Sequence, residues 1–145
     1  MSNHENPTDD ELRQILSHAK TIAMVGASAN ADKPSYRIMA QLLAAGYHVI
    51  PVNPKEKQVL GQPAFASLSD IKEPVDIVDV FRKSDDTPPI ADEAAAIGAK
   101  TLWMQLGVSN EDAATRAKAK GLTVIMDKCI GATHTALQIA PKARA

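Results

Sequence analysis

The sequence predicts an α/β protein in which about five parallel strands form a doubly wound sheet with a three-layer α/β/α arrangement. Short apolar runs alternate with helical patterns five times along the chain, which is typical of such sheets. The first run, residues 22–25, is apolar on both faces, as strands in the middle of a parallel sheet are. Polar residues follow the runs, and right-handed crossovers bring these positions to one edge of the sheet. We therefore expect a ligand crevice at that edge.

Length and composition indicate one domain over residues 1–145, with loose ends at 1–7 and 140–145. The sequence has 16 basic and 17 acidic residues, so its net charge is −1 and no surface for nucleic acid is expected. The N-terminus lacks a signal-peptide core, and no apolar run approaches the length of a membrane span. These features predict a cytoplasmic protein with no membrane partner. The single cysteine, Cys129, fits a reducing compartment.

Local signals define the elements in order. Capping residues and prolines open the helices, glycines end them, and short apolar runs give the strands. The expected helices are the one that Thr8 and Glu11 open as a capping box, 35–45 with Gly46 as its stop, 68–72, 88–97, 110–120 and one within 132–139. The expected strands are 22–25, 47–52, 75–81, 101–106 and 122–126, while 58–65 is expected to be loop with at most a short extended piece.

Numbered in chain order, the strands are expected to lie in the order 3-2-1-4-5. The winding then reverses at the first strand, and the crevice opens over its carboxyl end. The loop there reads G-A-S-A-N-A-D-K-P-S from Gly26 to Ser35 and leads into a helix. Such a loop commonly binds phosphate, because the first turn of a helix has free N–H groups and positive dipole character.

The candidate ligand-binding residues follow the strands. They are Gly26, Ser28, Lys33 and Ser35 after the first strand, Asn53 and Pro54 after the second, Phe81 and Arg82 after the third, and Gln105 at the end of the fourth. Ser28 and Ser35 have alternative interpretations, as a cap on local backbone and as a helix N-cap. Trp103 and Met104 are expected in the core rather than at the ligand.

The first loop differs from the dinucleotide fingerprint G-x-G-x-x-G, of which only Gly26 is kept. Asn53 stands at about the position where NAD-binding proteins have an acidic residue for the ribose. Two lysines, Lys55 and Lys57, follow it and favour a phosphorylated ribose. NAD is therefore disfavoured, whereas NADP and coenzyme A both remain candidates.

The residues offer no complete catalytic site. The patterns G-x-S-x-G, G-x-x-x-x-G-K-[ST] and H-E-x-x-H are absent. His134 has no second ligand at metal-binding spacing, so no metal site is predicted. A Cys129–His134 pair is conceivable but lacks a third group to orient it. We therefore expect a binding protein rather than an enzyme.

The sequence closely resembles the stand-alone CoA-binding domain proteins of bacteria, single-domain relatives of the nucleotide-binding part of the succinyl-CoA synthetase alpha subunit. The resemblance runs from about Glu11 to Ile130 and is carried by five ordered blocks: V-G-A-S-A-N-A-D-K-P-S-Y, G-Y-H-V-I-P-V-N-P-K, S-L-S-D-I-K-E-P-V-D-I-V-D-V-F-R, G-A-K-T-L-W-M-Q-L-G-V and G-L-T-V-I-M-D-K-C-I.

This resemblance implies a Rossmann-like fold that binds coenzyme A through its phosphorylated adenosine and pyrophosphate. By position, it implies that Gly26 and Ser28 line the pyrophosphate turn, with Lys33 and Ser35 at the helix entry. Asn53 and Pro54 are implied to lie against the ribose, Phe81 and Arg82 to flank the adenine side, and Gln105 to close the crevice.

The chain departs from these relatives in two ways. It has no room for the synthetases' second domain with its phosphorylated histidine, so ligase activity is not implied. The family's C-I-x-x-E-H reads C-I-G-A-T-H here, from Cys129 to His134. The expectation is a protein that binds CoA or acyl-CoA, with a protein partner left open. The alternatives are an NADP-dependent oxidoreductase and a thiol-redox module in which Cys129 forms a mixed disulfide with CoA.

Overall fold

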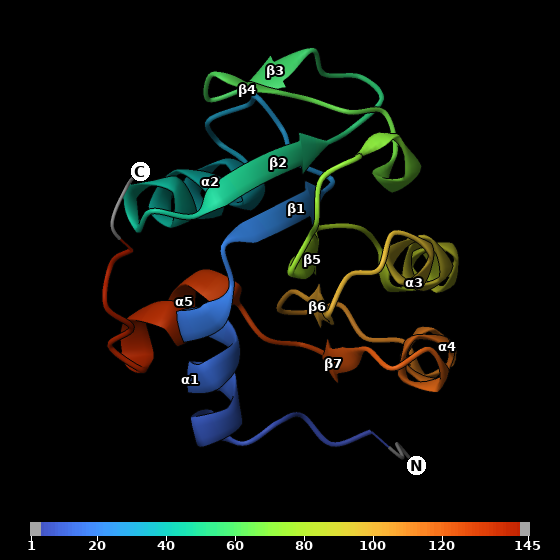
Figure 1. The fold of residues 1–145 in the computed structure, drawn as a ribbon. Coiled ribbons are helices and arrows are strands. Elements are labelled where there is room, and N and C mark those ends of the chain that lie inside the picture. The colour runs from blue at the N-terminus through green and yellow to red at the C-terminus, as the bar shows by residue number, and fades with distance from the viewer. Residues whose placement is uncertain (1–3, 143–145) are drawn as a thin grey trace.

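Apolar strands and amphipathic helices assemble into three layers in the computed structural model, which describes residues 4–142 (Figure 1). The helices are α1 (Asp9–His18), α2 (Pro34–Ala44), α3 (Thr87–Ala96), α4 (Glu111–Ala119) and α5 (Ile130–Ala136), with short 3₁₀ turns at Leu68–Asp70 and Ser84–Asp86. The strands of the main sheet are β1 (Thr21–Val25), β2 (His48–Val52), β5 (Ile77–Val80), β6 (Thr101–Met104) and β7 (Thr123–Ile125).

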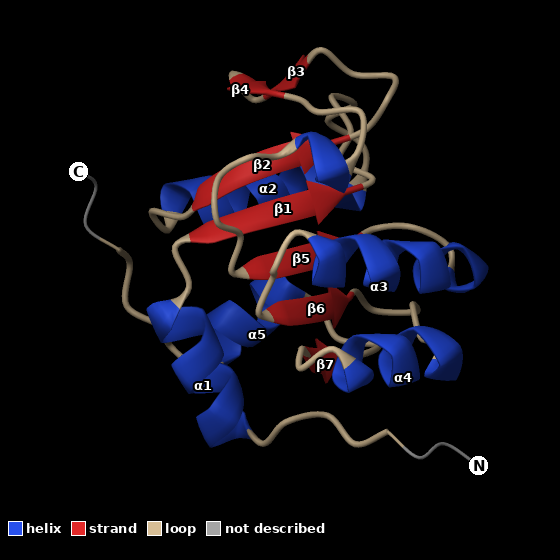
Figure 2. Ribbon diagram, turned by 45° about the vertical axis from the view of Figure 1, so that its right-hand side comes forward, coloured by secondary structure: helices blue, strands red, loops and turns tan. Residues whose placement is uncertain are grey.

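All five main strands are parallel, and their arrowheads point the same way in Figure 2. Helices α1, α2 and α5 cover one face of the sheet, and α3 and α4 cover the other. Trp103 lies in the hydrophobic core on the first face of the sheet, where it is fully buried as expected. Met104 lies in the core on the second face. The predicted doubly wound, three-layer fold is therefore confirmed.

The predicted strand order 3-2-1-4-5 is wrong. The observed order is β2-β1-β5-β6-β7, so the third strand of the expected set pairs with β1 and not with β2. The reason lies in residues 53–65, which return along the outer edge of β2. There Phe65 N donates to Pro51 O at 3.0 Å and Asn53 N donates to Phe65 O at 2.9 Å. This edge is therefore occupied, and the winding reverses between β1 and β5.

Local predictions agree closely with the observed elements. Thr8 and Glu11 form the capping box of α1, and Asn110 caps α4. The expected loop at 58–65 contains a short hairpin of β3 (Gln58–Val59) and β4 (Gln62–Pro63). The last helix begins two residues before its expected range, at Ile130.

The two segments expected to be loose are attached within the described residues. Asn6 exchanges two hydrogen bonds with the backbone of Met126, each 2.8 Å long. Lys142 N donates to Ala45 O at 2.7 Å, and its ammonium donates to Ser17 O at 2.6 Å. Residues 1–3 and 143–145 lie outside the described residues.

None of the helices within residues 4–142 has the length and apolar character needed to cross a membrane.

The sheet contains a fully buried carboxyl group, that of Asp79. It lies in β5, between Met24 of β1 and Trp103 of β6. Its Oδ1 accepts a hydrogen bond from Nε2 of Gln105, whereas Oδ2 has no hydrogen-bond partner within residues 4–142. Burial raises the pKa of Asp79 from 3.8 to about 8, and the Gln105 amide opposes this shift only in part. The carboxyl is therefore protonated at neutral pH.

The protonation of Asp79 predicts a specific pH dependence of stability. Between about pH 4 and pH 8 the native protein holds a proton that the unfolded chain has released. The free energy of unfolding should therefore fall by about 1.4 kcal/mol per pH unit as the pH rises. Asp79→Asn removes this titration, so the stability of the variant relative to the natural protein should grow with pH.

Urea unfolding of both proteins at pH 5, 6, 7 and 7.5 measures this difference, in which contributions from other titrating groups cancel. Asp85→Asn, which removes an exposed carboxylate, is the matched control. Parallel profiles for the natural protein and Asp79→Asn would show that Asp79 is ionised in the native state.

Candidate functional site

Three adjoining cavities lie along the carboxyl edge of the sheet. The central one, which we call the cation-lined cavity, has a volume of about 590 Å³. Its lining residues are Gly26, Ser28, Lys33, Pro34, Ser35, Asn53, Pro54, Lys55, Phe81 and Arg82. This lining includes three cationic side chains and no carboxylate. A cavity of this kind favours an anionic ligand.

The turn after β1 requires glycine for two reasons. Gly26 has φ +88°, a left-handed conformation that side chains disfavour. A Cβ atom here would also collide with the carbonyl oxygen of Phe81 and would lie 3.2 Å from Cδ of Arg82. The chain segments just after β1 and β5 therefore come into contact at Gly26, and both Gly26 and Phe81 line the cation-lined cavity.

Side chains hold the loop after Gly26 in shape. Ser28 Oγ accepts a hydrogen bond from Asn30 N at 3.1 Å, and Asn30 Oδ1 accepts one from Asp32 N at 2.9 Å. The local backbone interpretation of Ser28 is thus observed, and Ser28 also lines the cavity. The hydroxyl hydrogen of Ser28 is not used by the Asn30 bond and can be donated to a ligand.

The start of α2 differs from one expectation. The N-cap is Lys33, which makes no side-chain capping bond, so the interpretation of Ser35 as the N-cap is wrong. Pro34 occupies the first helical position and Ser35 the second, where Ser35 is 4% exposed. Proline has no N–H group, so the first amide that α2 can offer is that of Ser35.

Two side chains join the loop after β2 to the loop after β1. Asn53 Nδ2 donates to Ala27 O at 2.8 Å, while its Oδ1 accepts from Lys55 N at 2.9 Å. Glu56 Oε2 accepts from Ala29 N at 2.5 Å. Asn53 therefore fixes the spacing of the loops on either side of the cavity. Glu56 was not singled out from the sequence, because only the tertiary structure brings it to Ala29.

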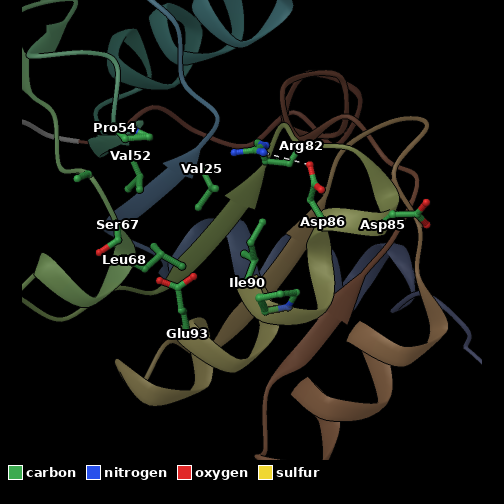
Figure 3. A pocket seen from close by; sticks show the side chains of 12 residues that line it. Val25, Val52, Pro54, Ser67, Leu68, Arg82, Asp85, Asp86, Ile90 and Glu93 are labelled. Carbon is green, nitrogen blue, oxygen red and sulfur yellow. Dashed lines mark hydrogen bonds and ion pairs between the residues drawn. The ribbon is translucent and has the colours of Figure 1, made fainter.

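Arg82 lines both the cation-lined cavity and a second cavity of about 390 Å³, whose lining side chains are drawn in Figure 3. We call this second one the acidic cavity; it is lined by Val25, Val52, Pro54, Ala66, Ser67, Leu68, Arg82, Asp85, Asp86, Pro89, Ile90 and Glu93. Arg82 Nη2 lies 3.1 Å from Asp86 Oδ2 in an ion pair that is half exposed, and the two side chains point toward one another in Figure 3. Solvent weakens such a pair, so Arg82 remains available to a ligand phosphate.

Phe81 borders a further cavity together with Gln105, which does not line the cation-lined cavity. With Pro34, Arg37, Ile38, Leu106, Val108 and Cys129 they line a third cavity of about 380 Å³, which we call the apolar cavity. Phe81 and Arg82 share the cation-lined cavity, and each also borders one neighbour of it, Phe81 the apolar cavity and Arg82 the acidic cavity.

The structure brings eight of the nine candidate residues to one cavity. The exception is Gln105, which lines the apolar cavity and is 3% exposed. Its amide oxygen accepts from Ile130 N at 3.3 Å while its amide nitrogen donates to Asp79. Lys55 also lines the cation-lined cavity. From the sequence it was expected only to favour a ligand with a phosphorylated ribose. The contact that each residue makes with a ligand stays a prediction.

Cys129 and His134 make contacts with different residues. Cys129 is half-buried, and its sulfur accepts from Ala132 N at 3.4 Å. The His134 ring packs edge-on against Tyr47, with the ring centroids 5.8 Å apart. Burial, followed by the charge of Lys142, lowers the pKa of His134. None of these observations supports a Cys129–His134 pair. Residues 4–142 contain no cluster of three or more His, Cys, Asp or Glu side chains suited to a metal ion.

Comparison with known proteins gives relatives over nearly the whole chain. The uncharacterized protein YneT of Bacillus subtilis (strain 168) is 43% identical over 130 residues, which cover 90% of this chain and 96% of YneT. A structure of a hypothetical protein from Pyrococcus horikoshii OT3 has a TM-score of 0.89 at 35% identity and covers 95% of this chain and 99% of that one.

A third relative is much longer. The ADP-forming acetate–CoA ligase of Methanocaldococcus jannaschii is 26% identical over 139 residues, which cover 90% of this chain but only 20% of the ligase. The chain thus spans about a fifth of that enzyme. The family described as CoA binding domain matches residues 20–135, which include every candidate residue. On this match, and on the relatives of similar length, the chain belongs to the CoA-binding domain family.

Proposed function

We propose that this protein binds coenzyme A, or an acyl-CoA, at the carboxyl ends of its strands and has no complete catalytic site of its own. One observation carries the proposal. The cation-lined cavity joins the phosphate-type loop to Lys33, Lys55 and Arg82 without any carboxylate in its lining. Membership of the CoA-binding domain family supports the same ligand. The cytoplasmic location and a protein partner stay predictions.

The geometry supports one orientation of the ligand. Its pyrophosphate would lie in the cation-lined cavity, near the Ser35 amide and the Ser28 hydroxyl. Its adenine would enter the acidic cavity, where Val25, Leu68 and Ile90 offer apolar contact. The Glu93 carboxylate in the same lining can accept a hydrogen bond from the amino group of adenine.

Calorimetric titration with CoA, dephospho-CoA and NADP tests the choice of ligand. CoA should bind with micromolar affinity, on the order of −8 kcal/mol. Dephospho-CoA should bind about tenfold more weakly or worse, because it loses charge-assisted hydrogen bonds to the ribose phosphate. Binding of NADP without binding of CoA would favour the oxidoreductase alternative and contradict the proposal, as would the absence of heat with any of the three ligands.

Arg82→Ala tests the role of the cation between two cavities. Loss of a charge-assisted contact to phosphate should weaken CoA binding by about tenfold or more without unfolding the protein. Arg116→Ala is a matched control, because Arg116 also forms an exposed ion pair with an aspartate four residues away, Asp112 at 3.1 Å, but lies in α4. Equal CoA affinity in the two variants, with unchanged circular dichroism, would remove Arg82 from the site.

A second candidate function, thiol-disulfide chemistry with CoA, is favoured by the position of Cys129. Its side chain lines the apolar cavity together with Phe81, which also lines the cation-lined cavity. The Cys129 thiolate would attack CoA disulfide, a Cys129–CoA disulfide would form, and one CoA thiolate would leave.

Intact-mass measurement after incubation with CoA disulfide tests this second candidate. The natural protein should gain one CoA, and a reductant should remove it. Because Cys129 is the only cysteine in the sequence, Cys129→Ser should gain none. Oxidised glutathione is the matched reagent, and an equal rate of adduct formation with it would show that no CoA site directs the reaction.

A further inference from the structure

We infer that the apolar cavity holds the acyl chain of a CoA thioester, so that the preferred ligand is an acyl-CoA rather than free CoA. The inference rests on the proposed function. The apolar cavity shares Pro34 and Phe81 with the cation-lined cavity. In an acyl-CoA the pantetheine arm separates the phosphates from the thioester, so this arm would pass Phe81 and the acyl chain would enter the apolar cavity. The adenine end would lie in the opposite direction, beyond Arg82.

The side chains of the apolar cavity suit hydrocarbon better than the amides of pantetheine. Pro34, Ile38, Phe81, Leu106 and Val108 supply most of the lining. The lining also includes Arg37, Gln105 and Cys129. Arg37 donates a hydrogen bond to Asp32 O at 3.1 Å, and Gln105 uses its amide on Asp79 and on the backbone of Ile130. A pantetheine amide in this cavity would lose hydrogen bonds to water that the five apolar side chains cannot replace. An alkyl chain has no such requirement.

Leu106 is exposed at this cavity. Within residues 4–142 it is the one large apolar side chain that is mostly accessible to solvent, at 73%. A single exposed leucine is ordinary on a protein surface. Here, however, it borders a cavity in which five of the eight lining residues are apolar, and an acyl chain would cover it. The volume of about 380 Å³ is of the size that small ligands occupy.

Titration with CoA, acetyl-CoA, butyryl-CoA and hexanoyl-CoA tests the inference. Each methylene that enters the cavity should lower the dissociation constant by up to about fourfold, or about fifteenfold between acetyl-CoA and butyryl-CoA. S-butyl-CoA should bind like butyryl-CoA, because its chain occupies the same space. This thioether cannot transfer its chain to Cys129, so it separates binding from any covalent reaction.

Leu106→Asp places a charge at the rim and should reduce the ratio between the acetyl-CoA and hexanoyl-CoA dissociation constants at least tenfold. Ala119→Asp adds the same charge to the exposed end of α4, near the amino edge of the sheet, and should leave that ratio unchanged.

The possible failures are distinguishable. If CoA binds but the dissociation constant changes less than about twofold with chain length, the inference is overturned and the proposed function stands. An unaltered ratio in Leu106→Asp would also overturn it, because the chain would then lie elsewhere. If neither CoA nor any thioester binds, the proposed function itself fails.

Discussion

The site depends on the close approach of β1 and β5. Phe81 N donates to Val25 O at 2.8 Å, and the backbone of Gly26 passes so near Phe81 that a Cβ atom would not fit. This contact brings the loop after β1 beside the loop after β5, at the point where the winding of the sheet reverses. Parallel sheets bind ligands at such points, because neighbouring loops leave in opposite directions and open a crevice between them.

Charge is segregated along this crevice. Lys33, Lys55 and Arg82 surround the central cavity, while the carboxylates Asp85, Asp86 and Glu93 lie beyond Arg82. A ligand with phosphates at one position and a hydrogen-bond donor at another would match this pattern. Arg82, which forms a half-exposed ion pair with Asp86, lies at the boundary between the cationic and the acidic lining. Charge is thus unevenly distributed along the crevice, although the net charge of the chain is only −1.

Asp79 and Gln105 link the core of the sheet to the other end of the crevice. The buried carboxyl of Asp79 holds the Gln105 amide, and Gln105 in turn accepts a hydrogen bond from Ile130 at the start of α5. A nearby bond, from Trp103 Nε1 to Lys128 O at 2.8 Å, fixes the same loop to β6. These contacts determine where Cys129 stands in the apolar cavity. Burial keeps Asp79 neutral, so the arrangement requires no buried charge.

The sequence by itself determined the alternation of strands and helices, the Thr8–Glu11 capping box and the residues at the strand ends. It could do so because apolar periodicity and capping are local properties. Eight candidate residues share one cavity because parallel strands all end at the same edge. Tertiary structure alone decided the strand order, since several orders satisfy the same alternation, and it moved the N-cap from Ser35 to Lys33. It also placed Phe81 beside the apolar cavity and Arg82 beside the acidic cavity and brought Glu56 to Ala29, because these relations depend on contacts between distant segments.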